Sequence, residues 1–307
     1  MSLATTMPIM ITQVVAMFIM MMVGGVLFRC KIVDNAGSAQ LASVALYVAT
    51  PAVIVQSLAG TFSPDKLMAG IACAVLSALL TVLSAFVAWL VFRDRRRIAQ
   101  LGVMISNMGF MGIPLVQNVV GEQYVFYISA CIAAQVPLLW TYGLWLASQD
   151  MSTISPKRIA TNPSILAVAV GIVLFLCSID LSGVIQVTAQ DLGNLNTGLA
   201  MLVLGTYLAQ TDFRSLLKDA NLYVASALRL VVVPVIMIAL LVFVPLDTTV
   251  KLVVVIAASA PCGTVAGMFP QMFGGDYRFG AGLVSLSTLL SLAIMPLVLA
   301  AALVLFA

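Results

Sequence analysis

Long apolar runs alternate with short polar segments along almost the whole chain. A helix needs about 20 apolar residues to cross a hydrocarbon core about 30 Å thick, and ten runs approach or exceed that length. The runs span residues 7–28, 37–59, 67–92, 98–120, 124–148, 163–179, 193–210, 220–244, 249–273 and 279–306. The pattern predicts an all-α membrane protein with ten transmembrane helices, forming one transmembrane domain over residues 1–307 without a separate soluble domain.

Runs four and nine contain residues that interrupt helices. Proline lacks the N–H of the helical hydrogen bond, and glycine relaxes the backbone. Such residues are Gly109, Gly112 and Pro114 within SNMGFMGIPL of run four, and Pro261, Gly263, Gly267 and Pro270 of run nine. Open backbone at membrane depth is tolerated only when it is buried in protein or lines an aqueous cavity. We therefore expect two broken helices that border such a cavity.

A shift of 153 residues places the two breaks over one another. It pairs Ser106 with Ser259, Gly121 with Gly274 and Tyr124 with Tyr277. Each half (1–153 and 154–307) then holds five runs, and because five is odd the second half must be inverted in the membrane. Either break alone is typical of an ordinary proline kink, but breaks at corresponding positions indicate an inverted-repeat transporter with its site at the breaks.

The composition supports membrane embedding and disfavours most enzyme classes. Of the 307 residues, 63% are hydrophobic and 8% are charged, with a mean hydropathy of +1.16, whereas about a quarter of a soluble domain is charged. All eleven acidic residues lie in loops or at run ends, histidine is absent, and the five cysteines show no paired spacing. Metal sites and hydrolytic triads need clusters of such residues. We therefore predict no enzyme activity, metal or cofactor.

Basic residues are distributed unevenly between the loops. The odd-numbered loops hold eleven of the fourteen Lys and Arg residues, including the block RDRRR (Arg93–Arg97), and the even-numbered loops hold Lys66 and Lys251. The positive-inside rule places the odd loops in the cytoplasm and both termini outside. No Lys or Arg precedes Arg29, so the first run is predicted to be a retained membrane helix rather than a signal peptide. The block RDRRR is interpreted as a topology anchor, with binding of acidic lipid as the alternative.

The remaining basic residue, Arg229, lies deep inside run eight. A charge at this depth needs a partner, and the choices are backbone carbonyls, a carboxylate from a loop end, or an anionic substrate. Arg229 therefore either supplies positive potential to an anion or ties together the C-terminal ends of a broken helix. Both interpretations disfavour a cationic substrate.

The candidate substrate contacts surround the two breaks. Asn107 is the most specific, because its carboxamide offers a donor and an acceptor, although it could instead cap the open backbone. The other candidates are Ser106, Gly109, Ser259, Pro261, Gly263 and Thr264 at the breaks, with Gln56 and Gln135 in runs two and five. Small hydroxyls and Gln135 are also typical of contacts between helices. The N-terminal ends of the half-helices carry partial positive charge, which favours an anionic substrate.

Four stretches of the chain are similar to those of a known family. They are LASVALYVATPAVIVQSLAG, SNMGFMGIPL, NPSILAVAVGIVL and RLVVVP. They resemble bacterial members of the auxin efflux carrier family, which includes the plant PIN auxin exporters and bacterial carriers assigned to malate and malonate. The resemblance covers nearly the whole chain. It implies a fold like that of bile-acid sodium symporters, with helices four and nine crossing at the substrate site, one domain sliding like an elevator against a scaffold, and a homodimer formed through the scaffold.

The same resemblance bears on individual residues. Asn107 matches the family's crossover asparagine in helix four. The plant carriers have a second crossover asparagine in helix nine, where this chain has Ala260. The sodium-binding relatives have an acidic residue near that position, and SAPCGTVAGMFPQ contains none. An auxin-type site is thus not reproduced in full, and no acidic side chain at this crossover supports sodium coupling.

These observations predict a secondary active or facilitative carrier for a small organic anion, such as malate, malonate or an auxin-like acid, working by alternating access in the cell membrane. A sodium-coupled symporter on the same fold is the first alternative. An anion channel or a non-transporting membrane receptor is the second. The expected partners are the anion, membrane lipid and a second copy of the chain, and nucleic acid is not expected.

Overall fold

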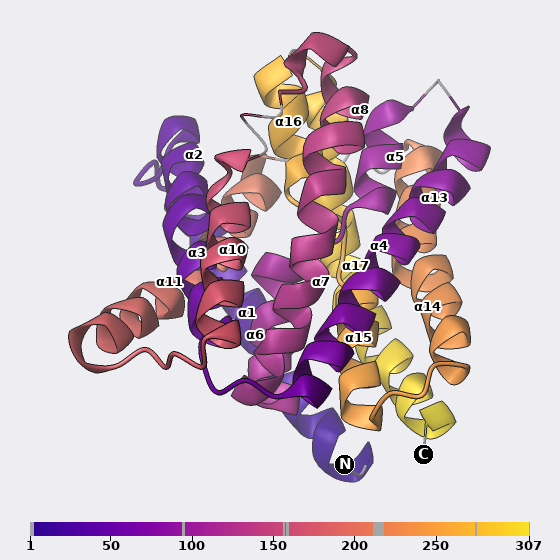
Figure 1. The fold of residues 1–307 in the computed structure, drawn as a ribbon. Helices are drawn as coiled ribbons and strands as arrows, with labels where there is room; N and C mark the ends of the chain where they lie inside the picture. Colours follow the sequence, from indigo (N-terminus) through magenta and orange to yellow (C-terminus); the bar gives the residue numbers. More distant parts are fainter. Residues whose placement is uncertain are drawn as a thin grey trace.

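The computed structural model describes residues 3–93, 96–155, 157, 160–210, 218–273 and 275–306. Asp94 and Arg95 of the basic block, and Gly274 of the predicted repeat, lie outside these residues. The regular elements in the described part of the chain are all helices, gathered in one bundle (Figure 1). The beginning of the chain and its end lie at the same end of the bundle (Figure 1).

The α-helices follow the predicted apolar runs in order. In the first half they are α1 (Leu3–Arg29), α2 (Asn35–Val44), α3 (Thr50–Leu58), α4 (Pro64–Phe92), α5 (Arg97–Met104), α6 (Ile113–Leu115), α7 (Val125–Leu138) and α8 (Leu144–Ser148). In the second half they are α10 (Pro163–Leu176), α11 (Gly183–Gln210), α13 (Ala220–Ala227), α14 (Val233–Val242), α15 (Thr248–Ser259), α16 (Val265–Phe273) and α17 (Tyr277–Phe306). The largest difference from the prediction is α11, which begins ten residues before run seven because its first turns contain polar residues that the apolar pattern leaves out.

Several of these helices are joined into longer ones by π-helical turns. The turns are η1 (Ala45–Ala49), η3 (Met108–Gly112), η4 (Val116–Val120), η6 (Leu139–Gly143) and η8 (Leu228–Val232). Three of them, η1, η3 and η8, end two residues before a proline, at Pro51, Pro114 and Pro234. Proline lacks an N–H and its ring collides with a carbonyl of the preceding turn, and a local π turn accommodates it without ending the helix.

Six helices are long and apolar enough to cross a membrane. They span Asn35–Leu58, Pro64–Phe92, Glu122–Ser148, Gly183–Gln210, Ala220–Val242 and Tyr277–Phe306. Four shorter apolar segments, Val15–Arg29, Met108–Val120, Pro163–Leu176 and Thr248–Ser259, lie in the remaining four predicted runs. The membrane-protein character of the chain is therefore confirmed, and the arrangement of ten spans in two inverted repeats stays a prediction.

Helices α1 and α11 pack with their backbones in contact. A Cβ atom at Gly205 of α11 would lie 1.9 Å from the carbonyl oxygen of Met21, and one at Gly24 of α1 would lie 2.2 Å from that of Leu202. No side chain fits at such distances, so glycine is required at both positions. Close backbone approach through small residues is a usual way for membrane helices to associate.

The Gly205→Ala variant is expected to lower stability by about 1–3 kcal/mol, because the added methyl group forces two packed helices apart. Gly198→Ala on the same helix is the matched control, since a Cβ there would meet no atom within 4 Å. Thermal unfolding of the purified variants in detergent measures both. Equal melting temperatures for the two variants would contradict the close packing of α1 against α11.

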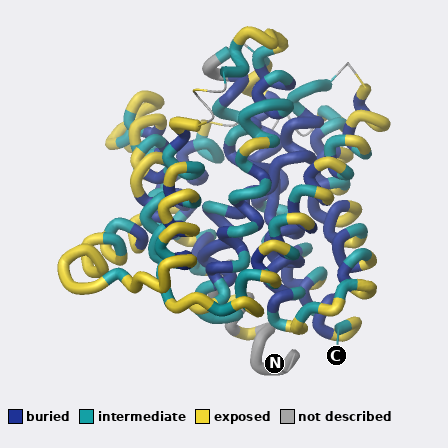
Figure 2. The backbone as a smooth tube through the Cα atoms, in the orientation of Figure 1, coloured by how far each residue is buried: buried dark blue, intermediate teal, exposed yellow. Residues whose placement is uncertain are grey.

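The interrupted helices occupy the interior of the bundle. Nine of the twelve residues of α15 and six of the eight residues of α5 are buried. Figure 2 shows buried backbone running through the middle of the bundle and exposed backbone along its outer helices. The two helices that the sequence predicts to be broken are thus enclosed by the others, as open backbone requires.

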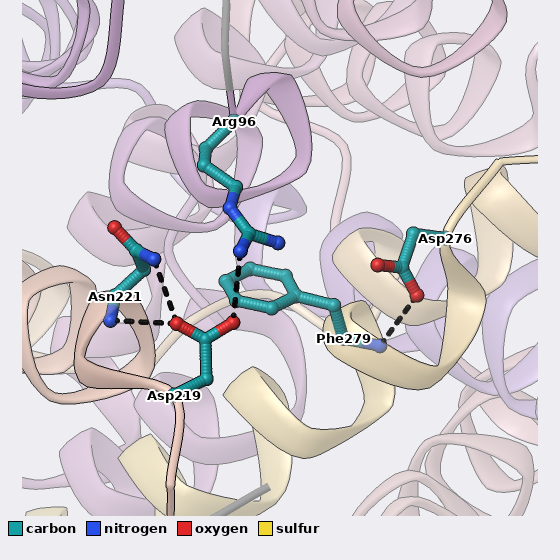
Figure 3. Close-up of polar contacts among 5 residues, drawn as sticks. All are labelled: Arg96, Asp219, Asn221, Asp276 and Phe279. Atoms are coloured by element: carbon teal, nitrogen blue, oxygen red, sulfur yellow. Dashed lines mark hydrogen bonds and ion pairs between the residues drawn. The ribbon is translucent and has the colours of Figure 1, made fainter.

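One ion pair connects the starts of three helices at the end of the bundle opposite the termini. The guanidinium of Arg96, just before α5, lies 3.2 Å from the carboxylate of Asp219 and stacks over the ring of Phe279 in α17 (Figure 3). Asp219 also caps α13 by accepting the N–H of Asn221 at 3.0 Å. Arg96 belongs to loop three, Asp219 ends loop seven and Phe279 follows loop nine, so these three loops meet at one end of the bundle. The predicted topology requires this, because it places all odd-numbered loops on one side of the membrane.

Candidate functional site

The two interruptions pair with each other. Helix α5 ends at Met104 and the chain becomes helical again at Met108, while α15 ends at Ser259 and α16 begins at Val265. Between these ends the backbone is extended, and Ser106 and Cys262 form an antiparallel bridge. The Asn107 N–H donates to the Pro261 carbonyl at 2.9 Å, and the Gly263 N–H donates to the Ile105 carbonyl at 2.8 Å. Each interruption therefore supplies hydrogen-bond partners to the backbone of the other.

The interruptions lie before most of the glycines and prolines that were expected to cause them. Gly112 and Pro114 are inside the helical segment 108–120, and Gly267 and Pro270 are inside α16. For Pro114 the reason is the π turn η3, which absorbs the missing N–H without ending the helix. The helix-break assignment of these four residues is thus corrected, because the extended backbone is at residues 105–107 and 260–264.

Serine hydroxyls stabilise the end of α15. Ser106 donates to the Ala257 carbonyl at 2.7 Å, and Ser259 donates to the Val255 carbonyl at 2.8 Å. On the other side of the interruption, the hydroxyl of Ser287 in α17 accepts the Cys262 N–H at 3.2 Å. The contacts of Ser106 and Ser287 have the helix-joining role that small hydroxyls often have in membranes, whereas the Ser259 contact lies within α15.

Gln135 of α7 supports the first interruption directly. Its carboxamide lies 3.1 Å from both the backbone nitrogen and the backbone oxygen of Ser106, with the amide assigned so that its oxygen faces the N–H and its nitrogen faces the carbonyl. Both backbone groups of Ser106 are thereby satisfied inside the protein. Gln135 also lines the cavity described below. It therefore both faces the cavity and connects two helices, the two alternatives that its position in the sequence left open.

Arg229 binds the C-terminal ends of both interrupted helices. The side chain is 1% exposed, and Nε donates to the Ala260 carbonyl at 2.9 Å while Nη2 donates to that of Ala258 at 2.7 Å. Nη1 donates to the Val103 carbonyl near the end of α5 at 3.2 Å. The sequence allowed two roles for Arg229, a counter-charge for an anion or a tie between helix ends. The structure shows the side chain tying helix ends together, and it does so for both broken helices rather than for one.

A cavity of about 150 Å³ lies beside the paired interruptions. A cavity of this size accommodates a benzene-sized molecule. Its wall includes these predicted site residues: Ser106, Asn107, Gly109, Gln135, Gly263 and Thr264. The predicted residues Gln56, Ser259, Pro261 and Arg229 are not among its lining residues. Gln56 instead lies near Gly193 of α11.

Asn107 is the polar group that most needs a ligand. The residue is 5% exposed, and its Nδ2 is buried without a hydrogen-bond partner among the described residues. Leaving a buried donor unpaired costs about 1–3 kcal/mol. An acceptor atom entering the cavity would remove that cost.

The rest of the cavity wall is mostly apolar. Trp140 and Phe269 are in edge-to-face contact at a ring-centroid distance of 5.4 Å, and both line the cavity together with Tyr47. Among the described residues that line it, none is charged. This aromatic part of the wall suits an apolar group next to the polar region at the interruptions.

Three polar wall residues were not among the sequence candidates: Thr50, Asn162 and Ser164. Asn162 caps α10, where its Oδ1 accepts the N–H of Ser164 at 3.0 Å. An Asn-Pro pair at the start of an apolar run is a recognisable helix-start signal. The sequence shows that cap but not that the helix begins at the cavity.

Comparison with known proteins gives a family for the chain. The family model described as membrane transport protein matches residues 9–299, nearly the whole sequence. Comparison with curated proteins finds no significant match.

Proposed function

This chain belongs to the membrane transport protein family, and from that premise we propose that it carries a small organic acid with one carboxylate across the membrane by alternating access. The family match confirms the resemblance to auxin efflux carriers that the sequence motifs indicate. The observation that carries the proposal is the buried, unpaired amide of Asn107 in an uncharged cavity. A carboxylate oxygen is an acceptor of the kind that this donor lacks.

The helix ends support an anion at this place. The segment 108–120 and α16 both begin at the cavity wall. The first N–H groups of a helix have no acceptor within it and carry partial positive charge. The opposite, negative ends of α5 and α15 are covered by the guanidinium of Arg229. The field in the cavity is therefore dominated by the positive helix ends.

The cavity wall favours one carboxylate over two. Away from the interruptions, a second carboxylate would meet mostly apolar side chains and the neutral polar residues Thr50, Asn162 and Ser164, and among the described lining residues it would meet no cation. Burial of an unpaired charge is strongly unfavourable. We therefore propose an acid with an apolar body, and malate or malonate fit this wall less well.

Counterflow in proteoliposomes tests the function. Vesicles loaded with unlabelled phenylacetate should accumulate labelled phenylacetate against its gradient, which a channel cannot drive. Butanoate should compete for uptake and butanedioate, its equivalent with a second carboxylate, should not. Stronger competition by butanedioate would overturn the assignment to one carboxylate, and counterflow absent for every acid tested would overturn the carrier function.

The position of the cavity supports alternating access. Apart from the interruptions, part of its wall lies next to odd-numbered loops, with Trp140 and Asn162 near loop five and Phe269 near loop nine, and the other wall residues lie near the middle of helices. Near the opposite ends of the helices, Phe175 of α10 packs on Phe62 and Phe126 at ring-centroid distances of 5.4 and 5.0 Å. We propose that this conformation faces the cytoplasm and is closed on the outer side.

Labelling of cysteines on the two ends of α10 checks this orientation. In a variant with Cys30 replaced by serine, a membrane-impermeant maleimide added outside should modify the exposed Cys177 but not a cysteine introduced by Ser164→Cys. Permeabilised cells should show modification of both, and phenylacetate should slow only that of the introduced cysteine. Modification of the introduced cysteine, as distinct from Cys177, from outside in intact cells would contradict the orientation.

A further inference from the structure

Asn196 of α11 connects three segments around the cavity although it does not itself line it. The residue is 1% exposed and both ends of its carboxamide are bonded. Its Oδ1 accepts the hydroxyl of Thr50 at 2.9 Å, and its Nδ2 donates to the carbonyl of Gly109 at 3.0 Å. Thr50 and Gly109 both belong to the cavity wall.

The Gly109 carbonyl is available because of Pro114. In the π turn η3 the N–H of Ile113 donates to the carbonyl of Met108, five residues earlier. In the same register the carbonyl of Gly109 would need the N–H of residue 114, which is proline and has none. Asn196 supplies the missing donor from another helix.

Asn107 therefore lies between two side-chain amides that hold its neighbouring backbone. Gln135 of α7 binds both backbone groups of Ser106 on one side, and Asn196 of α11 binds the carbonyl of Gly109 on the other. The segment between them carries the unpaired amide of Asn107. Its backbone position is fixed from two different helices.

We propose that Asn196 is a positioning residue for substrate: it holds the π turn at Gly109 so that the Asn107 amide is presented to the carboxylate. This inference rests on the proposed function. Binding groups must be held to within a fraction of an ångström, so release of Gly109 should weaken binding more than it weakens the fold.

The test compares Asn196→Leu with a matched variant on the same helix. Thr206 of α11 is also 1% exposed and bonds the hydroxyl of Ser38, away from the cavity. Thr206→Val removes that contact and serves as the control. Phenylacetate affinity is measured by titration of the purified protein, and melting temperature is measured without ligand.

We expect Asn196→Leu to weaken phenylacetate binding about tenfold, because a displaced binding group loses much of its interaction. Thr206→Val should lower the melting temperature but leave the affinity unchanged. Asn196→Ala, which removes the donor to Gly109 without adding bulk or charge, should weaken binding similarly and serves if the leucine variant does not fold.

Equal affinities for wild type and the Asn196 variants would overturn the positioning role, as would an equal loss of affinity in Thr206→Val. The proposed function has a separate test, because Asn107→Leu must weaken binding roughly 10- to 100-fold if the carboxylate site is correct. A loss with Asn107→Leu but not with Asn196→Ala leaves the function standing and removes Asn196 from it.

Discussion

Asn107→Leu should lose carboxylate binding while the protein becomes at least as stable as the wild type. A hydrogen bond to a charged group contributes about 1.5–3 kcal/mol, so binding should weaken roughly 10- to 100-fold. The same substitution removes a buried donor that has no partner among the described residues of the ligand-free protein. Its unfavourable burial disappears with it, and leucine has the same branched arrangement of side-chain heavy atoms as asparagine.

Asn118→Leu is the control for this variant. Asn118 lies in the same helical segment, is exposed, and donates to the Pro114 carbonyl at 2.8 Å. Phenylacetate affinity should be unchanged in this variant. Asn107→Asp should bind even less than Asn107→Leu, because a carboxylate in the cavity repels the substrate. If Asn107→Leu were destabilised and bound phenylacetate normally, Asn107 would be a structural cap and not a substrate contact.

Arg229→Met should be the most destabilising of the substitutions considered. It removes the donors for carbonyls at the ends of both interrupted helices, including those of Val103, Ala258 and Ala260. Buried acceptors without donors are costly, and the total loss should be ~3 kcal/mol or more. That corresponds to a fall in melting temperature of roughly 6–12 °C. Arg229→Lys should recover only part of it, since one ammonium cannot reach several carbonyls on both helices.

Arg96→Met provides the comparison. The Arg96 side chain is 41% exposed and its pair with Asp219 is at the surface, where ion pairs contribute about 0–1 kcal/mol. Melting temperatures of the purified variants distinguish the two arginines. An unchanged melting temperature for Arg229→Met together with weaker phenylacetate binding would instead assign Arg229 to the substrate.

The helices could be predicted from the sequence because their cause is local. Each apolar run is long enough to need a helix in lipid, and each of the ten runs coincides with helical segments in the structure. The position of the interruptions was harder to predict. Pro114 and Pro270 mark the right runs, but neighbouring π and α turns tolerate them, and the extended backbone at Ile105 and Ala260 depends on pairing between the two segments.

The site was predictable where one residue carries the chemistry. Asn107 has an unusual side chain for its depth, and the structure places it on the cavity wall. Asn196 is equally buried, and the reasoning applied to Gln56 and Gln135 would have included it. The hydrogen-bond partner of Asn196 is the Gly109 carbonyl, which is free because of the π turn. A pattern of side chains in the sequence does not show that this carbonyl is free. The role of Arg229 required the carbonyls of two distant helices to be seen together.

The central claim is that paired helix interruptions form a carboxylate site around Asn107. An experimentally determined structure of the protein with bound phenylacetate tests it most directly. We expect a carboxylate oxygen within hydrogen-bonding distance of Asn107 Nδ2, beside the first turn of segment 108–120, with the ring packed against Trp140 and Phe269. Phenylacetate bound elsewhere, with the Asn107 amide paired inside the protein, would contradict the claim.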